Sequence, residues 1–485
     1  MIVFMKTITT LVSSLLAIST VLLAILPAAA ASKPNIIIIL ADDMGYGDCG
    51  VYNPESKIAT PHIDQLASEG LRFTDAHSAG NTCTPSRYGL LTGTNPARTG
   101  VLNTLLKRGD PIIAESEKTI ADLLRDQGYS TKMIGKWHLG FEMDMSAKRP
   151  TYDFSKQLMG GPMDRGFDYF YGIHSSAGAS PLCYFKDRDV VEKPTEKTTF
   201  NLHRGAGISK TINAQIAPGF VQQEVSPNFC RNALEIIRAQ AASKQDKPLF
   251  LYYASPLPHQ PWVPIEKFKG KSGVGLYGDY IMQLDDVVGQ INRALKETGL
   301  DQSTILIFAS DNGPGPWAVK DMIEHKHNSS SVLKGCKATI WEGGHRIPFI
   351  VKWPGSIPAP SVSDATINFT DVFATLAELM GVDMTKLYLG NAKDSHSFLS
   401  VLLDPSKKHE RALMVNGLHT IRDGDWKLLS TARHTEPSSI NESQFRLFNL
   451  ADDIAEENDV SEAYPERTKR MYKAYQTFAE SRTLK

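Results

Sequence analysis

The 485-residue sequence has almost no net charge. Its 52 lysine and arginine residues nearly balance 53 aspartate and glutamate residues, which leaves a formal charge of −1 at pH 7. Proteins that bind nucleic acid through their overall charge carry an excess of basic residues, so the balance gives no indication of such a partner. If the protein binds an anion, a local cluster of positive side chains has to bind it.

Cysteine is also scarce. The five cysteines are Cys49, Cys83, Cys183, Cys230 and Cys336. No pair has the spacing of a zinc site, which argues against a structural zinc centre. If Cys83 has a chemical role, the other four allow three disulfide pairings in an oxidising compartment, and they are equally compatible with four free, buried thiols.

Only one long apolar segment is present, and it lies at the N-terminus. Lys6 precedes an apolar core over residues 11–26, and small residues follow at 28–31. This order is typical of a secretory signal peptide. The alternative is a membrane anchor, but serine and threonine interrupt the core and Pro27 ends it. We therefore expect residues 1–31 to be removed and the mature protein to be periplasmic or secreted, without a membrane attachment.

Internal repeats and low-complexity tracts are absent from the rest of the sequence. Its secondary-structure patterns nevertheless follow one another in a regular order. A helical pattern is followed by an apolar strand, and the strand by polar residues; residues 33–41, with an unbroken β-branched run, are typical of a parallel strand covered on both faces. This order predicts a doubly wound α/β sheet. Further strands are predicted over residues 71–77, 129–135, 248–254 and 303–309, and helices over 60–70, 119–128, 228–243, 277–298 and 371–380.

Two regions depart from this order. Residues 141–225 are rich in glycine, proline, lysine and aspartate, and they predict insertions and long loops of the kind that carry specificity residues. From Arg411 onward the pattern changes to short strands over residues 412–415, 419–422, 426–429 and 445–450, followed by a helix over 464–482. Asp423-Gly424 is a hairpin signal. We predict a small C-terminal subdomain, residues 406–485, with an antiparallel sheet and a helix.

The stretch NTCTPSRYGLLTG at residues 81–93 places a thiol and a guanidinium at the start of an apolar run. Pro85 suits the first turn of a helix, so Cys83 is expected at the helix N-terminus, where free amides and the helix dipole favour an anion. Arg87 lies one turn further along the helix and can reach the same end. A thiol in this field is expected to have a lowered pKa. For an isolated cysteine, a buried structural thiol would be the simpler interpretation.

Four oxygen donors follow two of the predicted strands. Asp42 and Asp43 come after the strand at residues 33–41, and Asp311 and Asn312 after the strand at 303–309. Ligands bind beyond the carboxyl ends of strands in such sheets, and hard oxygen donors suit Ca²⁺ or Mg²⁺. Taken separately, an Asp-Asp pair after a strand is more often a helix cap or a turn.

The stretch at residues 83–93 resembles the sulfatase signature Cys-x-Pro-Ser-Arg-x-x-x-Leu-Thr-Gly at every specified position. The resemblance implies that a formylglycine-generating enzyme oxidises Cys83 to Cα-formylglycine, whose hydrated aldehyde is the nucleophile, with Arg87 beside it. It also implies a calcium site formed by Asp42, Asp43, Asp311, Asn312 and the converted Cys83. Calcium is preferred over magnesium only on this resemblance.

Gly-Lys-Trp-His-Leu-Gly at residues 135–140 is similar to another motif of the family, letter for letter. Alternation along an extended chain would place Lys136 and His138 on one side. The resemblance implies that Lys136 binds sulfate oxygens and that His138 handles the formylglycine proton, with a pKa near neutrality.

Two further residues follow from the family pattern. His259, in Pro-His-Gln-Pro-Trp, is similar to the histidine that contacts the substrate and protonates the leaving alcohol. Lys337 matches the sulfate-binding lysine of Gly-Gly-Lys-Gly-Thr-x-Trp/Tyr-Glu-Gly-Gly, although Cys336 and Ala338 stand where glycine is usual. Trp262 is equally compatible with stacking on a sugar and with simple packing.

The resemblance, which extends from about Lys33 to the end of the chain, implies an alkaline-phosphatase-like α/β/α fold with a catalytic domain at residues 32–405. The implied activity is hydrolysis of sulfate monoesters. Export, the long insertion and Trp262, Trp317 and Trp341 suggest a sulfated carbohydrate: an algal galactan such as carrageenan, which we favour on overall resemblance, or a glycosaminoglycan. The alternatives are a general arylsulfatase, a phosphate or phosphonate monoester hydrolase, and a non-catalytic binder of sulfated glycans.

Overall fold

A computed structural model of the chain describes residues 33–102, 110–142, 152–205, 207–245, 247–409, 411, 413–430, 432 and 440–482. The expected signal peptide lies outside the described residues. None of the helices in the described part of the chain has the length and apolar character that crossing a membrane requires.

A ten-stranded sheet, in the order β13-β2-β12-β11-β1-β10-β4-β5-β6-β7, forms the centre of the fold. Its strands are β1 (Asn35–Ala41), β2 (Leu71–Phe73), β4 (Ser130–Lys136), β5 (Tyr169–Ile173), β6 (Phe185–Lys186), β7 (Asp189–Val190), β10 (Leu249–Ala254), β11 (Thr304–Ser310), β12 (Phe349–Lys352) and β13 (Ser361–Ser363). The central strands β11, β1, β10, β4 and β5 are parallel, as predicted. The sheet as a whole is mixed, because β12, which the sequence pattern did not predict, runs antiparallel to β11 and β2.

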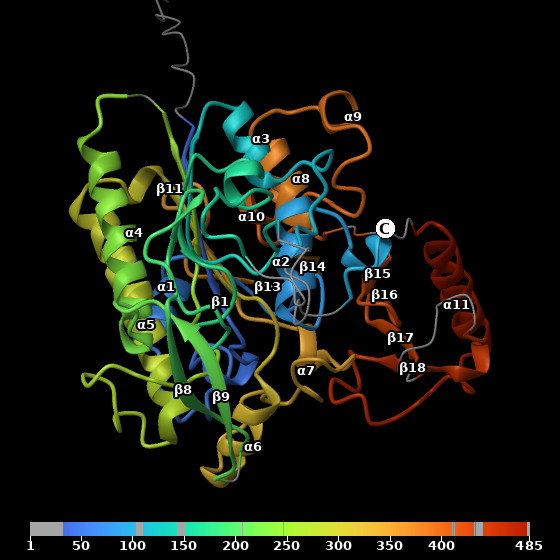
Figure 1. Ribbon diagram of the computed structural model, residues 1–485. Helices are drawn as coiled ribbons and strands as arrows, with labels where there is room; N and C mark the ends of the chain where they lie inside the picture. Colours follow the sequence, from blue (N-terminus) through green and yellow to red (C-terminus); the bar gives the residue numbers. More distant parts are fainter. Residues whose placement is uncertain are drawn as a thin grey trace, which may run out of the picture. The chain divides into compact units, whose positions relative to one another are not determined.

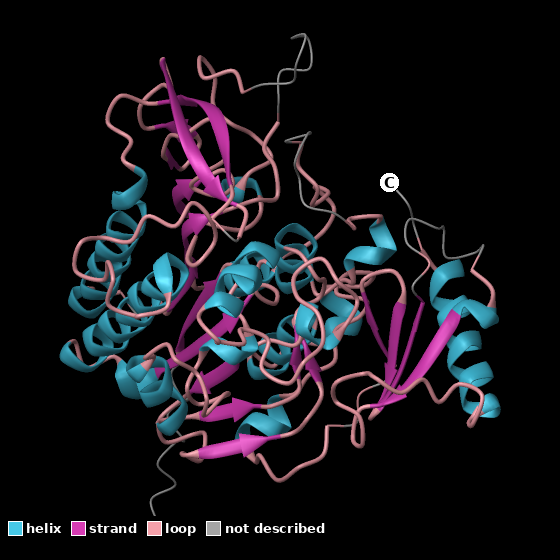
Figure 2. Ribbon diagram, turned by 90° about the horizontal axis from the view of Figure 1, so that it is seen from below, coloured by secondary structure: helices cyan, strands magenta, loops and turns pink. Residues whose placement is uncertain are grey.

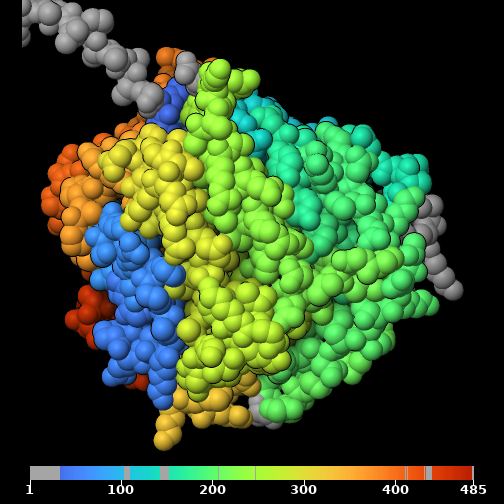
Figure 3. Space-filling model, turned by 90° about the vertical axis from the view of Figure 1, so that its left-hand side faces the viewer, coloured from blue at the N-terminus to red at the C-terminus, as the bar shows by residue number. Residues whose placement is uncertain are grey.

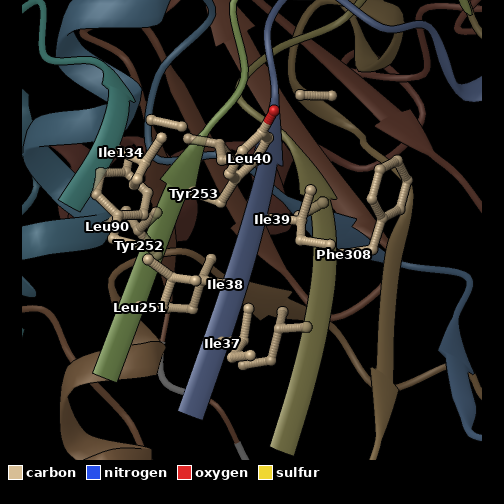
Figure 4. Packing of buried hydrophobic residues seen from close by; sticks show 14 of the residues in the cluster. Ile37, Ile38, Ile39, Leu40, Leu90, Ile134, Leu251, Tyr252, Tyr253 and Phe308 are labelled. Carbon is tan, nitrogen blue, oxygen red and sulfur yellow. The ribbon is translucent and has the colours of Figure 1, made fainter. Parts of the chain in front are cut away.

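The central strands are buried on both faces. Every residue of β1, β10 and β11 is buried, and apolar side chains from these strands, such as Ile38, Leu251 and Phe308, fill the space around them (Figure 4). A strand whose two faces are both covered by helices needs apolar residues at every position, and this explains the unbroken apolar runs in the sequence.

Helices cover both faces of the sheet (Figure 1). One face carries α1 (Pro61–Ser68), α4 (Val225–Ala242) and α5 (Gly275–Glu297), and α5 packs against the other two. Figure 3 shows this face, with the blue segment of α1 beside the yellow-green segment of α5. The other face carries α2 (Cys83–Thr92), α3 (Ile120–Asp126), α8 (Asp371–Leu379) and α10 (Leu399–Leu403). The expected α/β/α sandwich is confirmed.

Shorter elements connect these layers. They are β3 (Ala76–His77) and β14 (Ile367–Asn368), which pair with each other, and the helices α6 (Pro316–Glu324), α7 (Glu342–His345) and α9 (Met384–Leu387).

The prediction of long irregular loops over residues 141–225 is wrong for much of that segment. It contributes β5, β6 and β7 to the edge of the main sheet, and β8 (Glu196–His203) and β9 (Ser209–Ile216) form a long antiparallel hairpin. In β8, Thr198, Phe200 and Leu202 are half-buried and alternate with exposed residues. This period of two is the signal of a half-buried strand, and it is weak here because polar residues dominate both strands.

The C-terminal region forms the small antiparallel sheet that the sequence predicts. Its order is β15 (Met414–Asn416), β16 (Thr420–Asp423), β17 (Trp426–Ser430) and β18 (Phe445–Asn449), with α11 (Pro465–Glu480) packed against it around a separate apolar core (Figure 2). Asp423 pairs with Trp426 across the predicted turn, where Gly424 has a φ of 57°.

A buried network of charged side chains joins this small sheet to the rest of the structure. Lys427 Nζ on β17 lies 3.0 Å from Glu342 Oε1 on α7 and 2.7 Å from Glu456 Oε1, and all three side chains are fully buried. On β16, Arg422 lies 3.1 Å from Asp75 Oδ2 and 3.4 Å from Glu342 Oε2. Charges buried in this way are tolerated only when each is paired, and these pairs connect the two parts of the structure.

Two histidines complete the network. His77 Nδ1 lies 3.0 Å from His345 Nδ1, and His77 Nε2 lies 2.8 Å from Asp75. His77, Glu342 and His345 are close enough to hold a metal ion together. However, Lys427 Nζ is 3.0 Å from Glu342 and 3.4 Å from His345, so a positive charge already lies among them. We therefore interpret the group as a structural contact between α7 and the C-terminal sheet.

These histidines should make the fold sensitive to acid. Burial lowers the pKa of both His77 and His345. In an unfolded chain histidine titrates near pH 6.5, so below that pH the unfolded state binds more protons than the folded state. The free energy of unfolding should therefore fall between pH 7 and pH 5, by up to about 2 kcal/mol for each histidine.

Urea unfolding at pH 7, 6 and 5 would measure this loss. His77→Gln and His345→Gln variants remove the two titrating groups and should show a flatter dependence on pH than the unaltered protein. A protein that becomes more stable on acidification, or variants whose slope is unchanged, would contradict the assignment.

Candidate active site

The four predicted oxygen donors meet at one edge of the main sheet. β1 and β11 are parallel neighbours with Ala41 opposite Ser310, so the residues that follow them emerge side by side. The backbone N–H of Asp43 donates to Asp311 Oδ1 (3.1 Å), and Asn312 Nδ2 donates to Asp43 Oδ1 (2.8 Å). Their side chains, with that of Asp42, form one buried cluster of oxygen atoms.

This cluster fits a divalent cation. Asp42 Oδ1 and Asn312 Oδ1 are buried and accept no hydrogen bond from the described residues, although a buried oxygen normally has a partner. Burial raises the pKa of Asp311 to about 7, and the neighbouring carboxylate of Asp42 adds to this increase because the two negative charges repel each other. A hard cation with oxygen ligands would satisfy the two oxygens and remove the repulsion. Ligand atoms of Asp42, Asp43, Cys83 and His259 all lie within 4.8 Å of one another.

Cys83 lies beside this cluster as the first residue of α2, as the sequence predicts. Its Sγ is 3.1 Å from Lys337 Nζ and 3.9 Å from Asp43 Oδ1. The prediction of a lowered thiol pKa is wrong. Burial raises the pKa of Cys83 to about 12 and outweighs the nearby charges of Lys136 and Lys337. The unmodified thiol is therefore protonated and a poor nucleophile at neutral pH.

Arg87 and Lys136 hold the acidic groups from the other side. Arg87 donates from Nε (3.0 Å) and Nη2 (2.8 Å) to Asp311 Oδ2, and from Nη1 to the Lys136 carbonyl (3.0 Å). Lys136 Nζ donates to Asp42 Oδ2 (2.7 Å). Burial disfavours ionisation of Asp42, but the charges of Lys136, His259 and Arg87 prevail and hold its pKa well below the usual range.

Gly135 allows Lys136 to reach this position at the end of β4. Its φ is 110°, and a Cβ there would lie 1.9 Å from the carbonyl oxygen of Ala254 on β10. Only glycine fits, because the backbones of β4 and β10 approach too closely for a side chain. This explains the first residue of the Gly-Lys-Trp-His-Leu-Gly motif in physical terms.

His138 reaches the site by a different backbone path from the predicted one. Its φ is 58°, so the chain turns at His138 instead of remaining extended. The His138 N–H donates to the His174 carbonyl (2.9 Å), and Thr84 Oγ1 donates to the His138 carbonyl (3.2 Å). Both ring nitrogens are buried without a hydrogen-bond partner in the described structure.

The electrostatic surroundings of His138 also differ from the prediction. Burial, followed by the charges of Lys136 and Arg87, lowers its pKa well below the ordinary value, so the expected pKa near neutrality is wrong. The neutral imidazole has one nitrogen that accepts a proton and one that donates, and neither is used within the described chain.

His259 and Lys337 lie on the more open side of the cluster. His259 Nδ1 lies 2.7 Å from the Gln260 carbonyl, which leaves Nε2 facing Asp43 Oδ2 at 3.8 Å. Burial lowers the pKa of His259, although Asp42 and Asp43 act against this. Lys337 Nζ donates to Asp43 Oδ1 (2.5 Å), and its side chain remains 13% exposed.

Three residues of the site have left-handed backbones. Asp43, His138 and Ala338 have φ values of 70°, 58° and 66°. For residues with a Cβ this conformation costs about 1 kcal/mol or more each, and it persists because the surrounding contacts fix it. Ala338 occupies a position where the family pattern has glycine, and the structure gives the reason for that preference.

The sequence did not identify three buried residues that form a hydrogen-bonded group next to the backbone of Asp43: Tyr277, Asp48 and His327. Tyr277 OH on α5 donates to Asp48 Oδ2 (2.6 Å) and lies 3.2 Å from the Asp43 carbonyl oxygen, and His327 Nε2 lies 2.8 Å from Asp48 Oδ1. All three side chains are buried. The sequence offers only a weak signal for them, because each stands alone in its own stretch of chain.

Two open alternatives are settled. All five cysteines, each within the described residues, are free. Trp262 is only 3% exposed and packs between His203 and Tyr277, which identifies it as a packing residue.

Comparison with known proteins identifies the family of the chain. Residues 34–382 match the family model described as Sulfatase. The chain is 32% identical over 483 residues to N-acetylgalactosamine-6-O-sulfatase of Bacteroides thetaiotaomicron, covering 90% of this chain and 92% of that protein.

Two solved structures are similar to the whole described fold. One was determined in a study of how Bacteroides thetaiotaomicron metabolises multiple glycosaminoglycans; it is 30% identical, with a TM-score of 0.79 over 93% of this chain and 100% of that chain. The other, Ps i-CgsB in complex with k-i-k-neocarrahexaose, is 25% identical, with a TM-score of 0.70 over 93% of this chain and 94% of that chain. A family match across most of its length shows that the chain belongs to the sulfatase family and is a sulfuric ester hydrolase.

Proposed function

We propose that this sulfatase removes sulfate from a galacto-configured sugar in a glycosaminoglycan or an algal galactan. The observation that carries the proposal is the likeness, over 90% of the chain, to an enzyme that acts on N-acetylgalactosamine 6-sulfate. The similarity to the complex with a neocarrahexaose supports a galactan as the second source of the same sugar configuration.

The positive groups around Cys83 suit a sulfate ester. Lys337 Nζ is 3.1 Å from the sulfur, the charge of Lys136 also acts on the thiol, and Arg87 interacts electrostatically with Cys83. Because this cluster is buried, its charges and an adjacent cation would strongly stabilise negative charge that develops on sulfate oxygens during the reaction. The local cluster thus provides the positive charge for binding an anion that the nearly neutral chain as a whole lacks.

The family implies that residue 83 becomes formylglycine, and the hydrate of that aldehyde would supply an oxygen nucleophile where the thiol is poor. The residues around it have complementary tasks. His138, with both ring nitrogens free of hydrogen bonds within the described chain, would move a proton at residue 83. His259 faces the open side through Nε2, and its protonated form, which Asp42 and Asp43 favour against burial, would donate a proton from Nε2 to the departing sugar oxygen.

The metal-binding role of the acidic cluster predicts a loss of activity with chelator. Dialysis against EDTA should abolish hydrolysis, and Ca²⁺ should restore it. Ca²⁺ should also raise the Tm of the unloaded protein, because a ligand that binds only the folded state stabilises it by mass action, by about 2.7 kcal/mol at 100 times Kd.

Asn312→Ala removes the unpartnered Oδ1 and should weaken the Tm response, whereas Asp301→Ala, on a carboxylate that pairs with Lys352, should leave it intact. A Tm that does not respond to Ca²⁺ or to Mg²⁺ would rule out the cation site.

The proposed acid role of His259 predicts a dependence on the leaving group. His259→Ala should lower kcat/KM on a sugar sulfate by about 10²- to 10⁴-fold, and much less on an aryl sulfate whose acidic phenol leaves without a proton. Gln260→Ala is the matched control, because it keeps the backbone carbonyl that orients His259. Equal losses on both substrates would contradict the assignment.

A substrate panel tests the proposed function as a whole. Sulfate release would be followed by ion chromatography on N-acetylgalactosamine 6-sulfate, carrageenan oligosaccharides, an aryl sulfate and an aryl phosphate. Preference for the sugar sulfates supports the proposal. Faster release from N-acetylgalactosamine 6-sulfate indicates a glycosaminoglycan as the natural substrate, and faster release from carrageenan oligosaccharides indicates an algal galactan. Preference for the aryl sulfate indicates a general arylsulfatase, and preference for the phosphate a phosphomonoester hydrolase. Binding without any release would indicate a non-catalytic glycan binder.

We also propose that the protein acts outside the cytoplasm. The N-terminal sequence pattern supports removal of residues 1–31. The N-terminal peptide of the mature protein, recovered from the periplasm or medium of an expressing bacterium, should begin near Ser32. An intact N-terminus in the cytoplasmic fraction would overturn this proposal.

A further inference from the structure

The hairpin formed by β8 and β9 reaches the loops of the active site. Its tip packs against α6, as Figure 1 shows, and a Cβ at Gly205 would lie 2.6 Å from the Cβ of Lys320. On its inner side, the ring of His203 stacks on Trp262, with 5.1 Å between centroids. Trp262 is three residues beyond His259, so the hairpin is fixed beside the proposed acid.

The helix that the tip contacts begins at the cation loop. α6 starts at Pro316, four residues after Asn312, and a Cβ at Gly315 would lie 3.3 Å from Asp43 Oδ2. Two residues of chain span at most about 7 Å, so Trp317 lies close to the acidic cluster. The tip of the hairpin and the start of α6 therefore lie beside the acidic cluster.

Two positive side chains converge on Trp317. Arg204 Cζ, at the tip, lies 5.0 Å from the ring centroid, and Lys320 Nζ, on α6, lies 4.8 Å from it. Within the described chain, neither cation has a carboxylate within 4.0 Å, although most buried or half-buried cations in this structure do. Burial raises the pKa of Asp321, the neighbouring acid on α6, and the nearby His203 acts against this increase.

Like charges beside one ring repel each other, so this arrangement favours an anion between or above them. The aromatic ring offsets part of the repulsion and holds both side chains in place. Arg204 and Trp317 are half-buried and Lys320 is exposed, so the two charges remain accessible from solvent.

We propose that Arg204 and Lys320 bind a second acidic group on the glycan, either a sulfate or a uronate carboxylate on a sugar next to the one that is desulfated. The inference rests on the proposed function and adds to it: the substrate would be a chain with at least two acidic groups. The guanidinium would form paired hydrogen bonds with the anion, and the ammonium would add a point charge.

Kinetics on three substrates test the proposal. They are an aryl sulfate, an oligosaccharide with two sulfates and no uronate, and one with a single sulfate and a neighbouring uronate. Arg204→Ala and Lys320→Gln should each raise KM about tenfold on a substrate with the second acidic group, with kcat and the aryl sulfate kinetics unchanged. The oligosaccharide that responds identifies the second group. The increase in KM should shrink in high salt, because screening weakens exposed charge contacts.

The chain offers a matched control and a way to separate structure from binding. Lys197→Ala removes a charge from the far end of the same hairpin, opposite Gln215, and should leave KM unchanged on all three substrates. Lys320→Gln keeps the Cβ, Cγ and Cδ atoms that lie against Gly205, so this replacement preserves the contact with the hairpin tip. If Arg204→Ala slows all three substrates equally while Lys320→Gln slows none, Arg204 only holds the hairpin and the proposal is overturned. If the unaltered protein releases no sulfate from the aryl ester, the proposed function fails instead.

Discussion

Replacement of Cys83 by serine is expected to abolish turnover of every sulfate ester, with kcat lower by at least about 10⁴-fold, since losses of this order or greater follow removal of a nucleophile. Serine keeps a hydroxyl at the N-terminus of α2, within reach of Lys337, so the site can still bind sulfate. It cannot provide the second hydroxyl of an aldehyde hydrate. In the hydrate, loss of the proton from that hydroxyl would expel sulfate and restore the aldehyde. We therefore expect the variant to bind substrate and to react at most once.

Two measurements separate this expectation from simple damage to the site. Mass spectrometry of the peptide that contains residue 83, from a host that makes formylglycine, should show an aldehyde in the unaltered protein and unchanged serine in the variant. Cys336→Ser makes the same chemical change beside Lys337, at a cysteine that is only half-buried, and should retain most of the activity. Full turnover by Cys83→Ser, or an unmodified thiol in the active protein, would exclude the proposed nucleophile.

The position of the site could be predicted because its residues follow strands. Asp42 and Asp311 each come directly after an apolar run, and the carboxyl ends of parallel strands meet at one edge of a sheet. The sequence did not reveal that β1 and β11 are neighbours, because strand order depends on contacts between distant parts of the chain. Lys337 reaches Cys83 across 254 positions of the chain. Its role followed from the family pattern and not from any local rule.

Two of the wrong predictions, the pKa values of Cys83 and His138, share a physical cause. The helix N-terminus and nearby cations were expected to lower the pKa of Cys83, but the cost of burying a thiolate is larger and depends on how completely the fold encloses the side chain. The same cost lowers the pKa of His138. The left-handed turn at His138 has a different cause: the contacts of its backbone with His174 and Thr84 hold it, and these partners are distant in the sequence.

The glycine-rich motif around Lys337 contributes residues to two places in the fold, the acidic cluster and the buried network of the C-terminal sheet. Lys337 points to the active site, whereas Glu342, five residues later, lies in the buried network that holds the C-terminal sheet. The motif looks catalytic throughout when it is read as a sequence. The structure divides it into a half that contacts Cys83 and the acidic cluster and a half that pairs with the C-terminal sheet.

That division leads to the largest expected effect on stability. Lys427→Met should lower the free energy of unfolding by about 3–5 kcal/mol, because it leaves the carboxylates of Glu342 and Glu456 buried without their common cation. Burial disfavours the charge on Glu342, and Lys427 is the largest of the influences that nevertheless hold its pKa well below the ordinary value. The Tm should fall by roughly 3–5 °C.

A second variant and a control make this a test of the network. Combining Lys427→Met with Glu342→Gln removes one of the stranded charges and should recover part of the loss, which a double-mutant cycle measures as a coupling energy. Lys386→Met breaks a pair of similar length, 2.9 Å to Asp383, whose side chains are 79% and 45% exposed, and should change stability by no more than about 0.5 kcal/mol. If Lys427→Met is as mild as this control, the C-terminal sheet is held by its apolar contacts and the network has no energetic role.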